Sequence, residues 1–281
     1  MNGLNNNSTG NISFIGGGNM ARSLIGGLVA DGCDPATIWV SDNNDEQRLQ
    51  LQRQFQIHTS DSNIEAANAA DILILAVKPQ VMRSVTAELC ESVQRKKPLV
   101  ISIAAGLRET DINRWLGGNV AIVRAMPNTP SLIQTGATAL YANPQVSAAQ
   151  RNSAETILRA VGLALWVNEE KMMDAVTALS GSGPAYFFLF IEALEEAARG
   201  LGLAEKTAQL LALQTAFGAT KMALESSEDC ATLRKRVTSP GGTTEQAIRT
   251  FEEGQLRELV AKALTAAAHR SEELAQQLGA Q

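Results

Sequence analysis

A glycine-rich segment near the start of the chain is the first group of residues whose spacing could do chemistry. Gly16 to Ala21 reads Gly-x-Gly-x-x-Ala and follows an apolar run, Ile12–Ile15, that predicts a strand. In this pattern Gly16 permits a tight turn, Gly18 lets the backbone approach a pyrophosphate, and the next helix directs its amino end at the negative charge. A glycine triplet can be an ordinary turn, but the flanking strand and helix patterns favour a dinucleotide site.

The residues after the second predicted strand bear on which dinucleotide would bind. Asp42 could hold ribose hydroxyls, which favours NAD, whereas Ser41 and Asn43, assisted by Arg48, could hold a 2′-phosphate, which favours NADP. Each of these residues could instead be a helix cap or part of a solvated turn. We expect NADPH, with NADH possible.

Four further segments carry polar or small residues where a ligand could lie. Val77–Gln80 and Arg124–Pro130 end predicted strands, and ligands of open parallel sheets lie beyond those carboxyl ends. Ser180–Tyr186 and Ser239–Thr244 place small residues and exposed N–H groups before a helix, which predicts an anion site for a carboxylate. Either of these last two could also be ordinary loop and capping structure.

Together these segments resemble pyrroline-5-carboxylate reductase, from about Ile12 to Leu274. The resemblance implies NAD(P)H-dependent reduction of L-1-pyrroline-5-carboxylate to L-proline, the last step of proline biosynthesis. It also implies a Rossmann-like N-terminal domain and an all-helical C-terminal domain that interlocks with its mate. The family assembles as homodimers and often as larger rings of dimers.

The same resemblance assigns roles to individual residues. Those expected to bind the cofactor are Gly16, Gly18, Asn19, Met20, Ser41, Asn63, Ala76, Val77, Lys78, Pro79, Met126, Pro127 and Asn128. Those expected to bind the substrate are Ser239, Gly241, Gly242, Thr243 and Thr244. Of these, the amides from Gly241 to Thr243 would hold the carboxylate, and the Thr244 hydroxyl would lie near the ring nitrogen as the one catalytic side chain. No metal is expected.

The residue inventory agrees with this chemistry. The chain has only two histidines, His58 and His269, and three widely spaced cysteines, so a histidine-based metal cluster or a disulfide framework is not expected. A cyclic imine can take its proton from water before hydride arrives, so no strong base is needed. The protein mainly has to hold two rings face to face and anchor a carboxylate. Thr244 could alternatively be a helix cap, and for Lys78 a structural or cofactor role is favoured over proton donation.

Two other functions stay open at this stage. A β-hydroxyacid dehydrogenase also joins a dinucleotide-binding domain to a helical one, but here Phe187 stands at the spacing of that family's catalytic lysine. A catalytically silent NAD(P)-sensing protein would keep the binding residues without turnover. Reduction of pyrroline-5-carboxylate would separate all three functions.

These side chains need a scaffold, and the hydrophobic pattern predicts an α/β fold in two parts. Short apolar runs alternate with helical stretches up to about Asn168, which indicates a parallel sheet in a dinucleotide-binding domain over residues 1–168. Residues 169–281 are expected to be a helical dimerisation and substrate-binding domain. The predicted strands are Ile12–Ile15, Thr37–Val40, Asp71–Val77, Leu99–Ile103 and Val120–Val123, with edge strands near Tyr141 and Leu165. The predicted helices are Met20–Ala30, Asp45–Phe55, Ala148–Ala160, Pro184–Leu201, Glu205–Leu224, Thr243–Glu252 and Gln255–Leu278.

Composition bounds the number of domains and the kinds of partner and location that we expect. The 281 residues suggest about two domains, and a net charge of −5 gives no attraction for nucleic acid or anionic membranes. No apolar run approaches the roughly 20 residues of a membrane-spanning helix. Met1–Asn7 lacks the features of a signal peptide, so we expect a polar lead-in and a cytoplasmic protein. The alanine-rich helices are expected to need another subunit to cover them.

Overall fold

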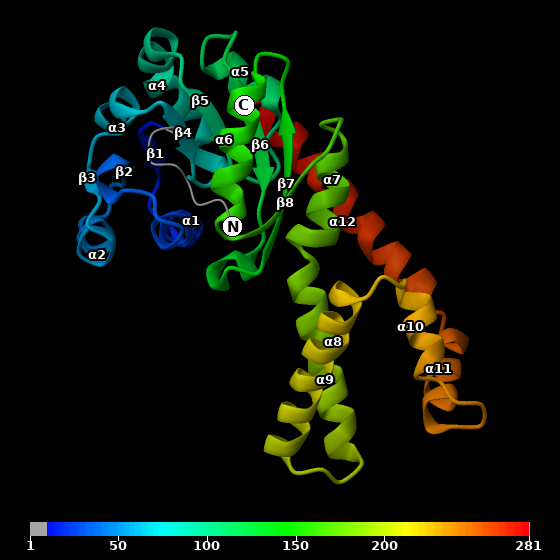
Figure 1. The fold of residues 1–281 in the computed structure, drawn as a ribbon. Helices are drawn as coiled ribbons and strands as arrows, with labels where there is room; N and C mark the ends of the chain where they lie inside the picture. The colour runs from blue at the N-terminus through cyan, green and yellow to red at the C-terminus, as the bar shows by residue number, and fades with distance from the viewer. Residues whose placement is uncertain (1–9, 281) are drawn as a thin grey trace. The chain divides into compact units, whose positions relative to one another are not determined.

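The computed structural model describes residues 10–280, so the polar lead-in expected at its start lies outside the described residues. Its eight strands form one sheet in the order β3-β2-β1-β4-β5-β6-β7-β8 (Figure 1). All neighbouring pairs are parallel except β6 and β7. The strands are β1 (Ile12–Ile15), β2 (Ile38–Ser41), β3 (His58–Ser60), β4 (Ile72–Leu75), β5 (Leu99–Ser102), β6 (Ile122–Met126), β7 (Gly136–Ala142) and β8 (Gly162–Trp166).

Helices connect the strands and cover both faces of this sheet. They are α1 (Asn19–Ala30), α2 (Asp45–Phe55), α3 (Asn63–Ala69), α4 (Met82–Lys96), α5 (Glu109–Trp115) and α6 (Ala148–Arg159). Several begin where a polar side chain accepts a first-turn amide, as Asn44 does for α2 and Ser147 for α6. The fold class and the strand and helix positions predicted from the pattern are confirmed, whereas β3, α3, α4 and α5 were not predicted.

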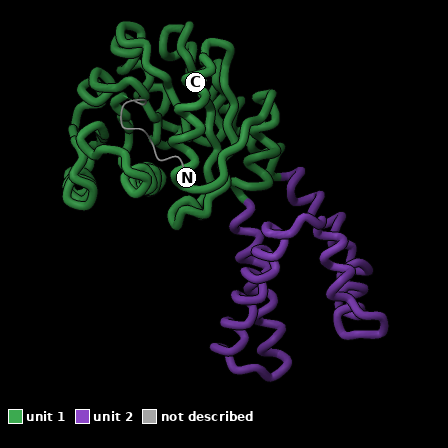
Figure 2. Tube along the Cα trace, in the orientation of Figure 1, with its two compact units in different colours: residues 1–182, 267–281 green, residues 183–266 purple. Residues whose placement is uncertain are grey.

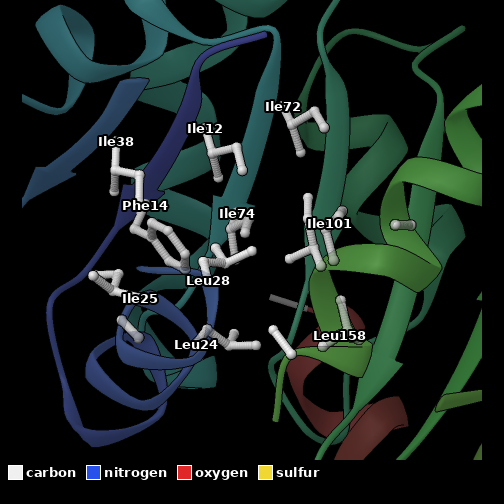
Figure 3. Close-up of a cluster of buried hydrophobic side chains, with 14 of the residues drawn as sticks. Ile12, Phe14, Leu24, Ile25, Leu28, Ile38, Ile72, Ile74, Ile101 and Leu158 are labelled. Atoms are coloured by element: carbon white, nitrogen blue, oxygen red, sulfur yellow. The ribbon is translucent and has the colours of Figure 1, made fainter. Parts of the chain in front are cut away.

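The core lies on the two faces of the sheet. Fully buried Phe14, Ile74 and Ile101 point from the strands toward Leu24 and Leu28 of α1 (Figure 3). The opposite face packs under α3, α4 and α5. β4 reads Ile-Leu-Ile-Leu with all four residues buried, because a strand covered on both faces is apolar throughout. These two apolar layers fix the strand ends that carry the site.

The second half of the chain is helical. Its elements are α7 (Met172–Val176), a π-helical turn (Thr177–Gly181), α8 (Gly183–Gly200), α9 (Glu205–Glu225), α10 (Cys230–Arg236), α11 (Thr243–Glu253) and α12 (Leu256–Gly279). None of the described helices is long and apolar enough to cross a membrane.

The compact units do not follow the expected boundary near residue 168. The first unit comprises residues 1–182 and 267–281, and the second comprises residues 183–266 (Figure 2). The turn at Thr177–Gly181 and the carboxyl end of α12 therefore belong to the unit that holds the sheet. The reason is packing: Ser271, Ala275 and Leu278 of α12 are buried in that unit.

Candidate functional site

The turn between β1 and α1 has the geometry that the glycine pattern predicts. Gly16 has φ +96°, and a Cβ on it would lie 2.8 Å from the Ala76 carbonyl oxygen, so only glycine fits. Its N–H donates to the Ser41 carbonyl at 2.8 Å. Gly18 is the N-cap of α1 without a side-chain acceptor, and nothing lies within 4 Å of its missing Cβ. The first amides of α1 thus have no side-chain acceptor, which suits an anion.

A cavity of about 570 Å³ lies at the carboxyl ends of β1, β2 and β4. β2 and β3 lie on one side of β1, and β4 and the later strands lie on its other side, so the strand order reverses at β1. Open α/β sheets bind nucleotides at such a switch point. Seven of the residues predicted to bind cofactor line the cavity: Gly16, Gly18, Ser41, Asn63, Ala76, Val77 and Lys78. The volume is in the range of ordinary ligand sites.

The remaining predicted cofactor residues do not line this cavity. They are Asn19, Met20, Pro79, Met126, Pro127 and Asn128. Conversely, the cavity wall includes residues that the sequence analysis did not name: Asn44, Gln47, Asp61, Val81 and Val85. The last two lie just before and in α4, a helix the pattern did not predict, so no sequence signal pointed to them.

Asp42 fastens the glycine turn to β2. Its carboxylate accepts the Gly17 N–H at 2.8 Å, the Asn44 N–H at 2.9 Å and the Gln47 side-chain amide at 3.3 Å. Arg48 donates to the Asp42 carbonyl at 2.6 Å and pairs with Asp45. Both charged groups proposed to select the cofactor are therefore engaged in hydrogen bonds of the turn itself.

Ser41 and Asn63 form a polar chain on the cavity wall. The Ser41 hydroxyl donates to the Asn63 Oδ1 at 2.8 Å, and the Asn63 Nδ2 donates to Glu88 of α4 at 3.0 Å. Because Asn63 is bonded at both ends of its amide, its orientation is fixed. The two predicted residues thus give the ribose end of the cavity a defined shape.

Asn128 joins the end of β6 to the helical turn that follows α7. Its Nδ2 donates to the Ser180 carbonyl at 3.0 Å, and its Oδ1 accepts the Ala137 N–H at 2.9 Å. Met126 packs so closely that a Cβ on Gly181 would lie 2.5 Å from the Met126 Cε. These contacts hold the Met126–Asn128 segment firmly.

For Ser180–Tyr186 the expectation is small residues and exposed N–H groups before a helix, with an ordinary loop as the alternative, and the structure shows neither at the start of this segment. Thr177–Gly181 is a π-helical turn, in which the Ser182 N–H donates to the Thr177 carbonyl at 2.8 Å. Serine and glycine are typical of loops, but here their small size permits the close packing against Met126. π turns of this kind are frequent at functional sites.

A buried ionic group includes Arg124 of β6. Arg124, 5% exposed, donates to Glu170 at 2.6 Å, and the same Glu170 oxygen accepts the Glu109 N–H at 2.5 Å. Burial lowers the pKa of Arg124, and the negative charge of Glu170 opposes that shift. Burial raises the pKa of Glu109, and repulsion from Glu170 adds to it.

A second ion pair, between Arg108 and Asp174, also accepts a hydrogen bond from α12. Asp174, 4% exposed, accepts from Arg108 at 2.6 Å and from the Ser271 hydroxyl at 2.7 Å. Ser271 thus bonds the returning segment, which begins at Ala267, to the rest of the sheet-bearing unit.

The Ser239–Thr244 segment forms a turn and the start of α11 in the second unit. The Gly242 N–H donates to the Ser239 carbonyl at 3.0 Å, and the Gly241 N–H donates to Glu245 at 2.7 Å. Two of the three amides predicted for the substrate carboxylate are therefore used by the chain itself.

The first amides of α11 are the ones that stay available. Gly242 is the N-cap and has no side-chain acceptor, so Thr243 and Thr244 occupy the first two helical positions, whose N–H groups have no partner within a helix. Thr244 is therefore not the cap residue. In the part of the chain that the structure describes, no hydrogen bond engages its hydroxyl.

Family models match both halves of the chain. Residues 11–106 match the model described as NADP oxidoreductase coenzyme F420-dependent. Residues 170–274 match the model described as pyrroline-5-carboxylate reductase dimerisation.

Proteins of known name match nearly the whole chain. A pyrroline-5-carboxylate reductase from Pseudomonas aeruginosa is 52% identical, over 97% of this chain and 99% of its own. One from Escherichia coli is 41% identical over 94% and 97%. The solved reductase from Coxiella burnetii is 51% identical with a TM-score of 0.92, over 95% of this chain and 98% of its own. That from Plasmodium falciparum, with NADP bound, is 29% identical with a TM-score of 0.84, over 95% and 99%.

Proposed function

The chain belongs to the pyrroline-5-carboxylate reductase family, and from that premise we propose that it reduces L-1-pyrroline-5-carboxylate to L-proline with NADPH. The observation that carries this proposal is the cavity at the switch point of the sheet, in a chain 52% identical to a named reductase. The full-length similarity favours this reaction over that of a β-hydroxyacid dehydrogenase. It would be the last step of proline biosynthesis.

The seven predicted cofactor residues that line the cavity support a dinucleotide as its ligand. We assign the pyrophosphate to the turn at Gly16–Met20, where α1 offers uncapped amides and Gly18 leaves open space. Ser41 and Asn63 would contact the adenosine side, and Ala76–Pro79 would lie over the ribose and nicotinamide. Met126–Asn128 would form the nicotinamide wall. The bound NADP of the Plasmodium relative supports NADPH over NADH, whereas Asp42 and Arg48 are both engaged in the turn and favour neither.

The helical half supplies the substrate contacts. We assign the substrate carboxylate to the amides of Thr243 and Thr244, at the positive amino end of α11, rather than to those of Gly241 and Gly242. The Thr244 hydroxyl would orient the ring nitrogen of the imine, which takes its proton from water. Ser239 supports this loop through its carbonyl. When NADPH is bound, its nicotinamide C4 supplies the hydride to the imine carbon.

One assay tests the reaction. The purified full-length protein should oxidise NADPH, followed by absorbance at 340 nm, when L-1-pyrroline-5-carboxylate is added, and L-proline should accumulate. A silent sensor would bind NADPH without consuming it, and a hydroxyacid dehydrogenase would respond to hydroxy acids instead. The same assay with NADH measures the cofactor preference; a preference for NADH would overturn the choice of cofactor and leave the reaction intact.

The assembly and setting are also proposals. The match of residues 170–274 to a dimerisation model and the exposed apolar side chains of α8 and α9 support a homodimer, and we propose a ring of dimers as the larger assembly. We propose the cytoplasm as its location, which agrees with the absence of a membrane-spanning helix in the described residues.

A further inference from the structure

Glu245 lies at the third position of α11, and its side chain reaches back across the preceding turn. Its Oε2 accepts the Gly241 N–H at 2.7 Å. Gly241 has φ +72°, the left-handed conformation that glycine adopts most easily. The carboxylate therefore bonds the one residue of the turn whose backbone conformation is unusual.

Little else holds this turn. Nothing lies within 4 Å of the position that a Cβ on Gly241 would occupy, and Ser239, Gly241 and Thr243 are exposed. Only one backbone hydrogen bond closes the turn, from the Gly242 N–H to the Ser239 carbonyl. An exposed glycine has many alternative conformations, so the Glu245 contact removes freedom that packing does not.

We propose that Glu245 is a positioning residue for substrate binding: its carboxylate fixes the Gly241 turn and so aims the free amides of Thr243 and Thr244 at the substrate carboxylate. This inference rests on the proposed function. Because Glu245 bonds the Gly241 amide, it does not occupy the amides that begin α11. Its negative charge lies near an anionic ligand and disfavours binding, so its contribution must come from geometry rather than from charge.

If Glu245 acts as the acceptor of the Gly241 N–H, two substitutions at this position should differ in their effect. Glu245→Gln keeps an acceptor oxygen for the Gly241 N–H, whereas Glu245→Ala removes it. We expect Glu245→Ala to raise the KM for pyrroline-5-carboxylate roughly five- to twentyfold, with kcat and the KM for NADPH within about twofold of the parent. Glu245→Gln should stay within about threefold of the parent in all three. The exposed Glu253 of the same helix, changed to alanine, is the matched control.

Amide hydrogen exchange provides a second measurement that does not require turnover. By NMR on the full-length protein, exchange at Gly241 should accelerate in Glu245→Ala and stay near the parent rate in Glu245→Gln. If the two variants show these exchange rates but the parent protein has no reductase activity, the proposed function is wrong. The contact between Glu245 and the Gly241 turn would still stand.

Three outcomes would overturn the inference. One is an unchanged substrate KM in Glu245→Ala. Another is a glutamine variant as impaired as the alanine variant, because the charge would then matter and not the acceptor. The third is an equal rise of both KM values, which would indicate general damage to the helix.

Discussion

Gly16 and Gly18 lack a side chain for different physical reasons. Gly16→Ala would place a Cβ 2.8 Å from a backbone oxygen at φ +96°, so we expect a loss of about 2–5 kcal/mol in the free energy of unfolding. Gly18→Ala meets nothing in the protein and should lower the melting temperature only slightly, since alanine is a poorer N-cap than glycine. If the pyrophosphate approaches Gly18, that variant should bind NADPH roughly five- to hundredfold more weakly, since overpacking costs about 1–3 kcal/mol. Thermal melts and NADPH titration of both variants test this, and normal NADPH affinity in Gly18→Ala would remove it from the site.

Thr244 is the residue whose hydroxyl we assign to the imine nitrogen. Thr244→Ala should lower kcat/KM roughly ten- to hundredfold, because a hydrogen bond to a charged group contributes about 1.5–3 kcal/mol. NADPH affinity should barely change. Thr250→Ala, on the same helix and bonded only to the Gln246 carbonyl, is the control. Normal kcat/KM in Thr244→Ala would exclude the hydroxyl from the reaction.

Glu109 makes stability depend on pH. Its folded pKa is raised, so the folded protein holds a proton at pH values where the unfolded chain has already released it. The stability that this group contributes is therefore complete below the unfolded pKa of about 4.5. It is lost as the pH rises from there through the folded pKa. Glu109→Gln removes this loss and keeps an acceptor for Asn143, so the variant should gain stability over the parent as pH rises above 4.5 and keep that gain at neutral pH.

Urea unfolding of parent and Glu109→Gln at several pH values measures this difference. Glu91→Gln, at an exposed position of α4, serves as the control and should follow the parent at each pH. A difference between Glu109→Gln and the parent that does not vary with pH would contradict the assignment.

The carboxyl end of α12 is a structural part of the sheet-bearing unit. Its buried residues Ser271, Ala275 and Leu278 recur at spacings of four and three, so one helical face packs there. Ser271→Ala removes the hydroxyl that Asp174 accepts from and should cost about 1.5–3 kcal/mol. Glu272→Ala, at the adjacent exposed position, should cost under about 0.5 kcal/mol. Equal melting temperatures for the two variants would contradict this role.

The sequence pattern predicted strongly apolar strands best, whereas length alone did not decide, since the 15-residue α4 was not predicted. The fully buried run of β4 and the amphipathic period of α8 were clear, whereas β3 has only three residues, two of them not buried, and gives almost no pattern. The glycine turn at Gly16 was predicted because its required conformation restricts the residue type. The Glu245–Gly241 contact was not, because a glutamate near a helix start is equally typical of a solvated first turn. Small residues at Ser180–Gly181 indicated an anion site or an ordinary loop, since the pattern cannot show that a methionine distant in sequence packs against them.

At the scale of the whole molecule, the apolar surface of the second unit determines the expected assembly. The side chains of Phe187, Phe188, Leu189 and Phe217 are each more than 60% exposed in the single chain. Exposed large apolar side chains in this number on two helices are expected to be covered by another subunit. We therefore expect light scattering to show at least a dimer at assay concentration. Phe187→Glu and Phe188→Glu together should dissociate it and abolish activity, whereas a fully active monomer would contradict the proposal.

The discontinuous first unit has a consequence for synthesis of the protein. Ser271 reaches Asp174 only after the ribosome has added the roughly 80 residues of the second unit. At ordinary elongation rates that interval lasts about 4–16 s. During it the sheet can form, but the surface that α12 later covers is exposed to chaperones and to other nascent chains. The nascent protein is therefore most vulnerable to misassembly in the seconds before residues 267–281 are made.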